Sequence, residues 1–144
     1  MTRTGDRRDP YANFNFLVKI DGITFGGFHE CTGHRSAIDE IEHREGGAPH
    51  PMKLPGLNKY GNLVLRRGMT VDRELYDWHL AALNGNVERR SGSIIVLDRK
   101  GKEQARWNFF DAWPQRMTGP ALNSEGSDVA IEEFELSVER LERG

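Results

Sequence analysis

Apolar and polar residues alternate along much of the chain, a pattern typical of β-strands that bury one face. The first clear case is residues 14 to 20, where apolar side chains occupy every even position. Asp21-Gly22 then favours a hairpin turn into a second strand over residues 23 to 32. Within that strand, Gly26-Gly27 predicts a bulge or a place where another backbone comes close.

Further strands follow, and they differ in how much of each face is apolar. Residues 38 to 44 are mostly polar and predict an exposed or edge strand. Residues 60 to 67 and 93 to 98 are apolar on both faces, so both strands need cover on two sides. Lys100-Gly101 is the turn into a strand over residues 104 to 113, which we expect Pro114 to end.

The last segment, residues 128 to 141, changes the parity of its apolar positions. Val129 and Ile131 are odd, whereas Phe134, Leu136 and Val138 are even. This strand either carries a bulge near residues 132 and 133 or buries first one side and then the other. Both alternatives place a long final strand against two surfaces.

One helix is predicted, over residues 72 to 83. Its apolar stripe has helical spacing, Thr70 or Asp72 can cap its start, and Asn84-Gly85 gives a stop. The stripe consists of Leu75, Trp78, His79, Ala82 and Leu83. The fold class is therefore mainly β: a small antiparallel barrel or sandwich of six to eight strands with a single covering helix.

A long loop joins the third and fourth predicted strands. It runs from Arg44 to Tyr60, well beyond the roughly 4–6 residues usual between elements. Met52, Leu54 and Leu57 lie within it, and a solvated segment has little use for such side chains. We expect these groups to be buried against something, such as another copy of the chain.

Composition limits the partners. The 144 residues predict one domain, residues 1–144, with a polar and flexible segment at residues 1–12. Twenty Lys and Arg against 22 Asp and Glu leave a net charge of −2, which does not favour nucleic acid or a membrane surface. Cys31 stands alone, which fits a reducing compartment, and the first residues predict neither a signal peptide nor a membrane span.

The residues give little support for a catalytic site or a metal-binding site. His29, Cys31 and His34 are close in sequence, but on a strand they do not share one face and no further ligand pattern completes a tetrahedral set. There is no GxSxG elbow and no phosphate-binding glycine motif. We expect no metal, no cofactor and no enzyme, with a small β-barrel enzyme as the minor alternative.

The pairs of adjacent residues with like charge, and the tryptophans, are explained without a catalytic or nucleic-acid site. Asp39-Glu40 and Glu132-Glu133 are adjacent in sequence, so on a strand they point to opposite faces and predict surface charge. Arg66-Arg67 and Arg89-Arg90 predict solvated charge or ion pairs between subunits in preference to a nucleic-acid site. The three tryptophans, 78, 107 and 113, predict core or interface anchors.

The order of these signals resembles a known family across nearly the whole chain. The segments that carry the resemblance are FLVKIDG (16–22), GGFHECTG (26–33), HREGG (43–47), LPGLNKYGNLVLRRG (54–68), LYDWH (75–79), IIVLDRKG (94–101), WNFFDAWP (107–114) and VAIEEFEL (129–136). In these segments the chain resembles the tail tube proteins of contractile-tailed bacteriophages, the class that also builds the inner tubes of extracellular contractile injection systems.

The resemblance implies a non-enzymatic inner tube subunit. Six copies would form a ring with a continuous β-barrel around a channel, and rings would stack into a hollow tube for protein cargo or DNA. The implied partners are the contractile sheath, the baseplate or tube initiator and the spike, with no direct membrane insertion. The protein would be made in the bacterial cytoplasm and assembled in a phage tail or injection particle that can be released. A tube-initiator or adaptor ring is the alternative.

By segment, the resemblance also implies three sets of assembly residues. The ring-stacking loop comprises Arg44, Glu45, Gly46, Gly47, Met52, Leu54, Pro55, Gly56, Leu57, Lys59 and Tyr60. The inter-subunit strand comprises Val129, Ile131, Phe134 and Leu136. The candidate lumen or interface charges, whose facing depends on strand register, are Asp39, Glu40, Glu42, Arg66 and Arg67.

Overall fold

The computed structural model describes residues 15–126 and 130–144, which form ten strands and one helix. The mainly β fold with a single helix, predicted from the sequence, is confirmed. In chain order the elements are β1 (Asn15–Ile20), β2 (Ile23–Phe25), β3 (Phe28–Thr32), β4 (Ser36–His43), β5 (Met52–Tyr60), β6 (Leu63–Gly68), α1 (Glu74–Leu83), β7 (Arg90–Leu97), β8 (Glu103–Thr118), β9 (Ile131–Ser137) and β10 (Arg140–Arg143).

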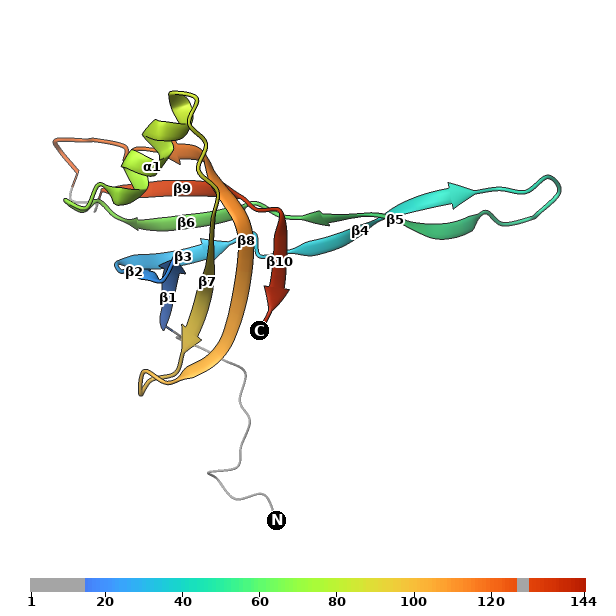
Figure 1. Cartoon of the computed structure of the whole chain (residues 1–144), viewed down its shortest axis with the longest axis horizontal. Helices are drawn as coiled ribbons and strands as arrows, with labels where there is room; N and C mark the ends of the chain where they lie inside the picture. The colour runs from blue at the N-terminus through green and yellow to red at the C-terminus, as the bar shows by residue number, and fades with distance from the viewer. Residues whose placement is uncertain (1–14, 127–129) are drawn as a thin grey trace, which may run out of the picture.

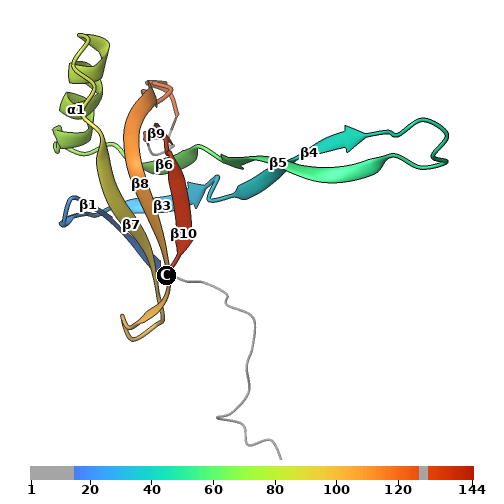
Figure 2. The same cartoon turned by 45° about the vertical axis from the view of Figure 1, so that its right-hand side comes forward.

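Eight strands form one antiparallel sheet that folds over at β8 into two halves (Figures 1 and 2). The first half has the order β2-β1-β7-β8, with β10 on the other side of β8. The second half has the order β8-β9-β6-β3. The first part of β8 pairs with β7 and β10, and from Trp113 onward β8 pairs with β9. This body is a small sandwich in which one strand belongs to both layers.

The core lies between the two halves and follows the alternation seen in the sequence. Val18 and Ile20 of β1 face it from one side, while Leu63 and Leu65 of β6 face it from the other. Phe109 of β8 is fully buried between them. Burial of such side chains stabilises the fold by about 1.5–3 kcal/mol each.

Helix α1 packs against β8 near the point where that strand changes partners (Figure 1). His79 is buried, and its Nδ1–H donates to the carbonyl oxygen of Pro114 at 3.0 Å. Trp78 Nε1–H donates to the carbonyl of Glu88 at 2.7 Å. The predicted cap at Thr70 or Asp72 is wrong, because the helix begins at Glu74 and its cap residue is Arg73, whose side chain makes no capping hydrogen bond. Asp72, one residue before the cap, accepts a hydrogen bond from the amide of Glu74, and Asn84 ends the helix as predicted.

Two predictions about strand boundaries are wrong. Gly26-Gly27 does not form a bulge, and no other backbone lies close to it, because both positions face open space. Instead, Gly27 adopts φ +81°, which separates β2, paired with β1, from β3, paired with β6. Pro114 does not end its strand either. It lies at a register shift where β8 exchanges β7 for β9, a position that tolerates a residue without an N–H.

The predicted parity change in the last strand is also wrong. The even positions 132, 134, 136 and 138 all face the core, and the segment divides into β9 and β10. The apparent change arose because a buried position is occupied by a charged residue, Glu132. Ile131 is half-buried on the opposite face, and Val129 lies outside the described residues.

Strands β4 and β5 form a separate two-stranded sheet that projects from the body (Figures 1 and 2). We call residues 36–60 the arm. The sequence predicted a loop over most of this region, but the second half of that loop is strand β5, and residues 44 to 51 make the connection. Pro55 and Gly56 obscured the strand in the sequence because both are uncommon inside strands. Pro55 is tolerated because the ribbon has free edges.

Candidate assembly surfaces

The arm is held by its backbone ladder and by exposed ion pairs. Lys53 Nζ lies 3.2 Å from a carboxylate oxygen of Glu40, and Lys59 Nζ lies 3.1 Å from one of Asp39. Such exposed pairs contribute about 0–1 kcal/mol each. Since an isolated two-stranded hairpin is at best marginally stable in water, the arm gains from any partner that covers it.

The arm exposes a set of large apolar side chains that nothing in the described chain covers. The exposed residues are Ile38, Ile41, Met52, Leu54 and Leu57. Leu57 is the most exposed of them, at 75% of its full area. Ile41 and Leu54 lie directly opposite each other across the two strands, and exposed apolar patches are typical of protein–protein contact surfaces. Three of the five belong to the predicted ring-stacking loop, whose stacking role stays a prediction.

Glycines shape the point where the arm leaves the body, a feature that the sequence reasoning missed. Gly33 has φ +87°, and a Cβ there would overlap the backbone carbonyl of Asn62. A Cβ on Gly61 would lie 2.6 Å from the carbonyl oxygen of Gly33. The two crossing segments are also tied by the amide of Gly61, which donates to the carbonyl of Arg35 at 2.8 Å. Only glycine permits this close crossing at the root of the arm.

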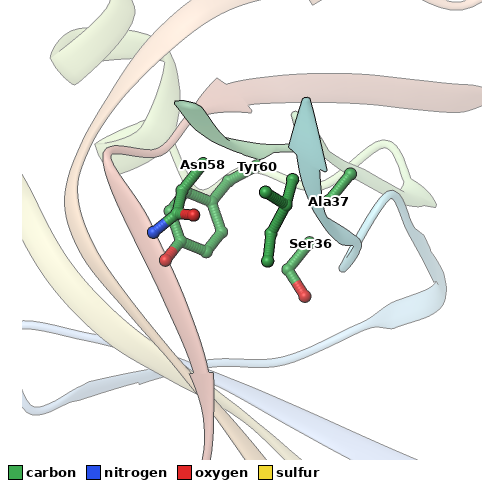
Figure 3. A pocket seen from close by; sticks show the side chains of 5 residues that line it. Ser36, Ala37, Asn58 and Tyr60 are labelled. Carbon is green, nitrogen blue, oxygen red and sulfur yellow. The ribbon is translucent and has the colours of Figure 1, made fainter. Parts of the chain in front are cut away.

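An open recess of about 470 Å³ lies beside the root of the arm. Figure 3 shows Asn58 and Tyr60 of β5 and Ser36 and Ala37 of β4 around it; Ile38 completes the lining. Tyr60 and Asn58 place a hydroxyl and an amide beside the apolar surface of Ile38 and Ala37. Tyr60, assigned to stacking by the resemblance, is half-buried here.

The candidate lumen charges occupy three different environments. Asp39, Glu40 and Glu42 lie on the arm, where Glu42 pairs in register with Lys53. Arg66 lies on the outer face of the second half of the sheet, 3.0 Å from Glu30 and 3.3 Å from Glu133. Both carboxylates raise the pKa of Arg66 above its ordinary value, and Glu30 has the larger effect. Which of these charges faces a channel stays a prediction.

Arg67 is different, and its assignment to a lumen or interface is wrong. Its side chain is buried, with Nε donating to Glu132 at 2.8 Å and Nη1 lying 3.8 Å from Asp72. The guanidinium lies over the rings of Phe28 and Phe134, 5.1 and 5.4 Å from their centroids. Glu132 was likewise wrongly predicted as surface charge. Its place two residues before Phe134, on the same strand face, was the available signal.

The assignment of Phe134 and Leu136 to inter-subunit contact is wrong as well, whereas that of Ile131, on the other face of β9, stays a prediction. β9 lies between β6 and β8 and is hydrogen-bonded to both. Phe134 and Leu136 face the core with 2% and 1% of their area exposed, so a neighbouring chain cannot contact them. Among the described residues of the body, β2, β3 and β10 each have a single strand partner and therefore a free edge.

The candidate metal-ligating side chains do not come together in the described part of the chain. Within residues 15–126 and 130–144, no three His, Cys, Asp or Glu side chains are grouped so that they could hold a metal ion. Burial, and then the charge of Glu30, raises the pKa of the Cys31 thiol to about 12. The helix in this part of the chain is too short and too polar to span a membrane.

Comparison with known families agrees with this picture of a β-body with assembly surfaces. A family model described as "T4-like virus tail tube protein gp19" matches residues 12–142. The chain belongs to this tail tube protein family. The resemblance predicted from the sequence is thereby confirmed, and the protein is a structural tail tube protein. A search of curated protein sequences finds no match.

Solved structures of other proteins share the fold of this tail tube protein. A chain from the PVC sheath–tube complex of an extracellular contractile injection system, in its extended state, is 26% identical with a TM-score of 0.88, and the match covers 100% of this chain and 99% of that one. A chain from the tube-terminating cap of the anti-feeding prophage is 23% identical, with a TM-score of 0.86 and coverage of 100% and 99%. Hcp1 from Flavobacterium johnsoniae is 15% identical, with a TM-score of 0.57 and coverage of 90% and 94%. The last two matches show the fold alone.

Proposed function

We propose that this tail tube protein is the inner tube subunit of a contractile injection machine or phage tail. Six copies form a ring, rings stack into a hollow tube, and the tube conducts protein cargo or DNA when the sheath contracts. The observation that carries the proposal is the arm, whose apolar side chains have no cover within the described chain.

The free strand edges support a ring. Unpaired N–H and C=O groups on an edge favour pairing with another chain, and closed barrels are the arrangement that removes edges altogether. β2, β3 and β10 offer three such edges on one body. In a closed ring, edges of one subunit meet edges of its neighbours, and the arm is left to reach beyond the ring.

The partners follow from this arrangement. The sheath–tube complex that contains the similar PVC chain supports a sheath around the tube. The ends of the tube require a baseplate or initiator with its spike, and the proposed site of synthesis is the bacterial cytoplasm, followed by assembly in the particle. We propose no enzymatic step.

A second function is an initiator, adaptor or terminator ring that does not propagate. The similarity to a chain from the cap of the anti-feeding prophage favours it, because the core of such subunits has the same fold. This function requires discrete hexamers in place of filaments.

The experiment that separates these functions is negative-stain electron microscopy of the purified protein over a concentration series. We expect long hollow filaments built of stacked rings. Isolated rings at every concentration would favour the initiator or terminator, and monomers throughout would overturn both proposals.

A further inference from the structure

An apolar recess of about 120 Å³ lies between the two halves of the body, beside the start of β1. Four of its lining residues belong to strands of the first half, one belongs to β3 of the second half, and one follows β3. These residues are Phe16, Ile94, Val96, Trp107, Cys31 and His34. We call this cavity the mouth recess.

The chemistry of the mouth recess favours an apolar occupant. Burial raises the pKa of the Cys31 thiol to about 12, with a further contribution from the charge of Glu30, so the thiol is neutral and packs as a small apolar group. The ring of His34 already lies against that of Trp107, with 4.9 Å between their centroids. Since an apolar cavity of roughly 150 Å³ holds benzene, a recess of this size fits a single phenyl ring.

The apolar face of β1 leads outward from the core to this recess. Val18 is fully buried, whereas Phe16 is half-buried and lines the recess. Asn15, the first residue of β1, still pairs in register with Leu97 of β7. The preceding residue, Phe14, lies outside the described residues, but side chains two apart on a strand point to the same face. Continuing β1 by one residue therefore directs Phe14 toward the recess.

We propose that the phenyl ring of Phe14 closes the mouth recess of its own chain. The ring packs beside Phe16 and Val96 of the first half and reaches His34 next to the second half, so that one side chain seals the core between the layers. The match to the family model begins at residue 12, which agrees with a domain that includes this residue. Because Cys31 belongs to β3, closing the recess also supports one of the free edges used in the proposed assembly, but the contact itself does not depend on that assembly.

A disulfide within one chain tests the contact. In a Cys31→Ala chain, Phe14→Cys with His34→Cys places one thiol at the proposed occupant and one at the rim of the recess. The matched control is Asn13→Cys with His34→Cys, since neighbouring residues on a strand point to opposite faces. After mild oxidation of dilute protein, mass spectrometry should show the intrachain disulfide forming about tenfold faster or more for the Phe14 pair.

Two results of this trapping experiment would overturn the proposal. Equal rates for the two pairs would show that residue 14 has no fixed direction relative to the recess. Disulfides between chains in place of bonds within one chain would assign the occupant to a neighbouring copy.

A cavity experiment tests the same contact without new thiols. Phe14→Ala should lower the melting temperature by about 5–10 °C, and Phe14→Leu by clearly less, because an apolar side chain is lost from a packed site. Benzene should bind to Phe14→Ala and restore part of the loss, because a ligand that binds only the folded chain stabilises it. Wild-type protein should not bind benzene. Equal binding to both chains, or an unchanged melting temperature in Phe14→Ala, would overturn the proposal and leave the recess as a site for a small apolar molecule.

Discussion

Arg67 is a charged side chain placed in the core, and its surroundings explain how it is tolerated. Glu132 neutralises it through a 2.8 Å hydrogen bond, while Phe28 and Phe134 pack against the guanidinium. Removing two charges from water is costly, so such a pair adds little net stability, but losing one partner leaves the other charge buried alone. The pair therefore fixes how β3, β6 and β9 meet in the core.

We expect Arg67→Met to lower the free energy of unfolding by about 3–5 kcal/mol, because Glu132 is then buried without its partner. Arg67→Met combined with Glu132→Leu should recover most of that loss, since both positions become apolar. Urea unfolding followed by tryptophan fluorescence measures both variants. Equal losses in the single and the double variant would contradict this account of the ion pair.

Cys31 should be nearly inert as a nucleophile. A pKa of about 12 keeps its thiol protonated throughout the working range, and the thiolate is the reactive form. At pH 8 we expect alkylation by iodoacetamide roughly a thousandfold slower than for a thiol of pKa 9.0, the ordinary value for cysteine. Mass spectrometry of native protein, with urea-unfolded protein as the control, measures the rate. Fast labelling of the native chain would show that the thiol is accessible and its pKa ordinary.

At the scale of single elements, predictions were right where local chemistry is decisive. The Asp21-Gly22 turn, the helix with its Asn84 stop and the hairpin at Lys100-Gly101 all depend on residues close together in sequence. Wrong predictions came from tertiary context. Pro114 is accommodated because β8 changes partners there, and Glu132 is buried because Arg67, 65 residues away in sequence, neutralises it.

The second strand of the arm was missed for a different reason. Both faces of β5 are largely exposed. The sequence of this strand therefore does not alternate between apolar and polar residues, which is the pattern that identifies a half-buried strand. The apolar content of this segment predicted a contact for Met52, Leu54 and Leu57, but only the family resemblance assigned that contact to ring stacking. The free edges of β2, β3 and β10 could not be predicted, because which strands pair is a property of the complete sheet.

The root of the arm should be sensitive to a single methyl group. Gly33→Ala requires a left-handed backbone, which costs about 1–3 kcal/mol in a non-glycine residue, and it also brings Cβ against the carbonyl of Asn62. We expect a lower melting temperature and displaced amide signals for residues 33–36 and 60–62 in NMR spectra. Gly101→Ala is the matched control, since φ is also positive there but nothing obstructs the new Cβ. Identical effects of the two substitutions would show that crowding at the root is unimportant.

At the scale of the whole molecule, the core and most of the arm are separate. The fully buried core residues lie in the body, and among the arm residues only the half-buried Tyr60 packs against them in the described chain. Changes on the arm should therefore alter association without altering the fold, which makes the proposed function accessible to mutation.

We expect Arg44→Glu, or Leu54→Asp together with disruption of Pro55-Gly56, to stop ring stacking while circular dichroism and the melting temperature stay within error of the wild type. Loss of one buried leucine contact of about 1.5–3 kcal/mol raises the concentration needed for stacking roughly tenfold or more. Sedimentation and electron microscopy measure the effect, with Lys100→Glu on the body as a charge-reversal control. Full-length tubes from the arm variants would show that the arm does not carry stacking.

Strand β8 has a mechanical consequence. Its sixteen residues run unbroken through both layers of the body, with Asp111 at φ 54° near the bend. In a sandwich whose layers are joined only by loops, little more than side-chain packing resists a sideways force that slides one layer over the other. Here the same force pulls on a covalent backbone that is clamped by hydrogen bonds in each layer. The body should thus resist shear as a single rigid block, the property needed by a part that is driven through a barrier at speed.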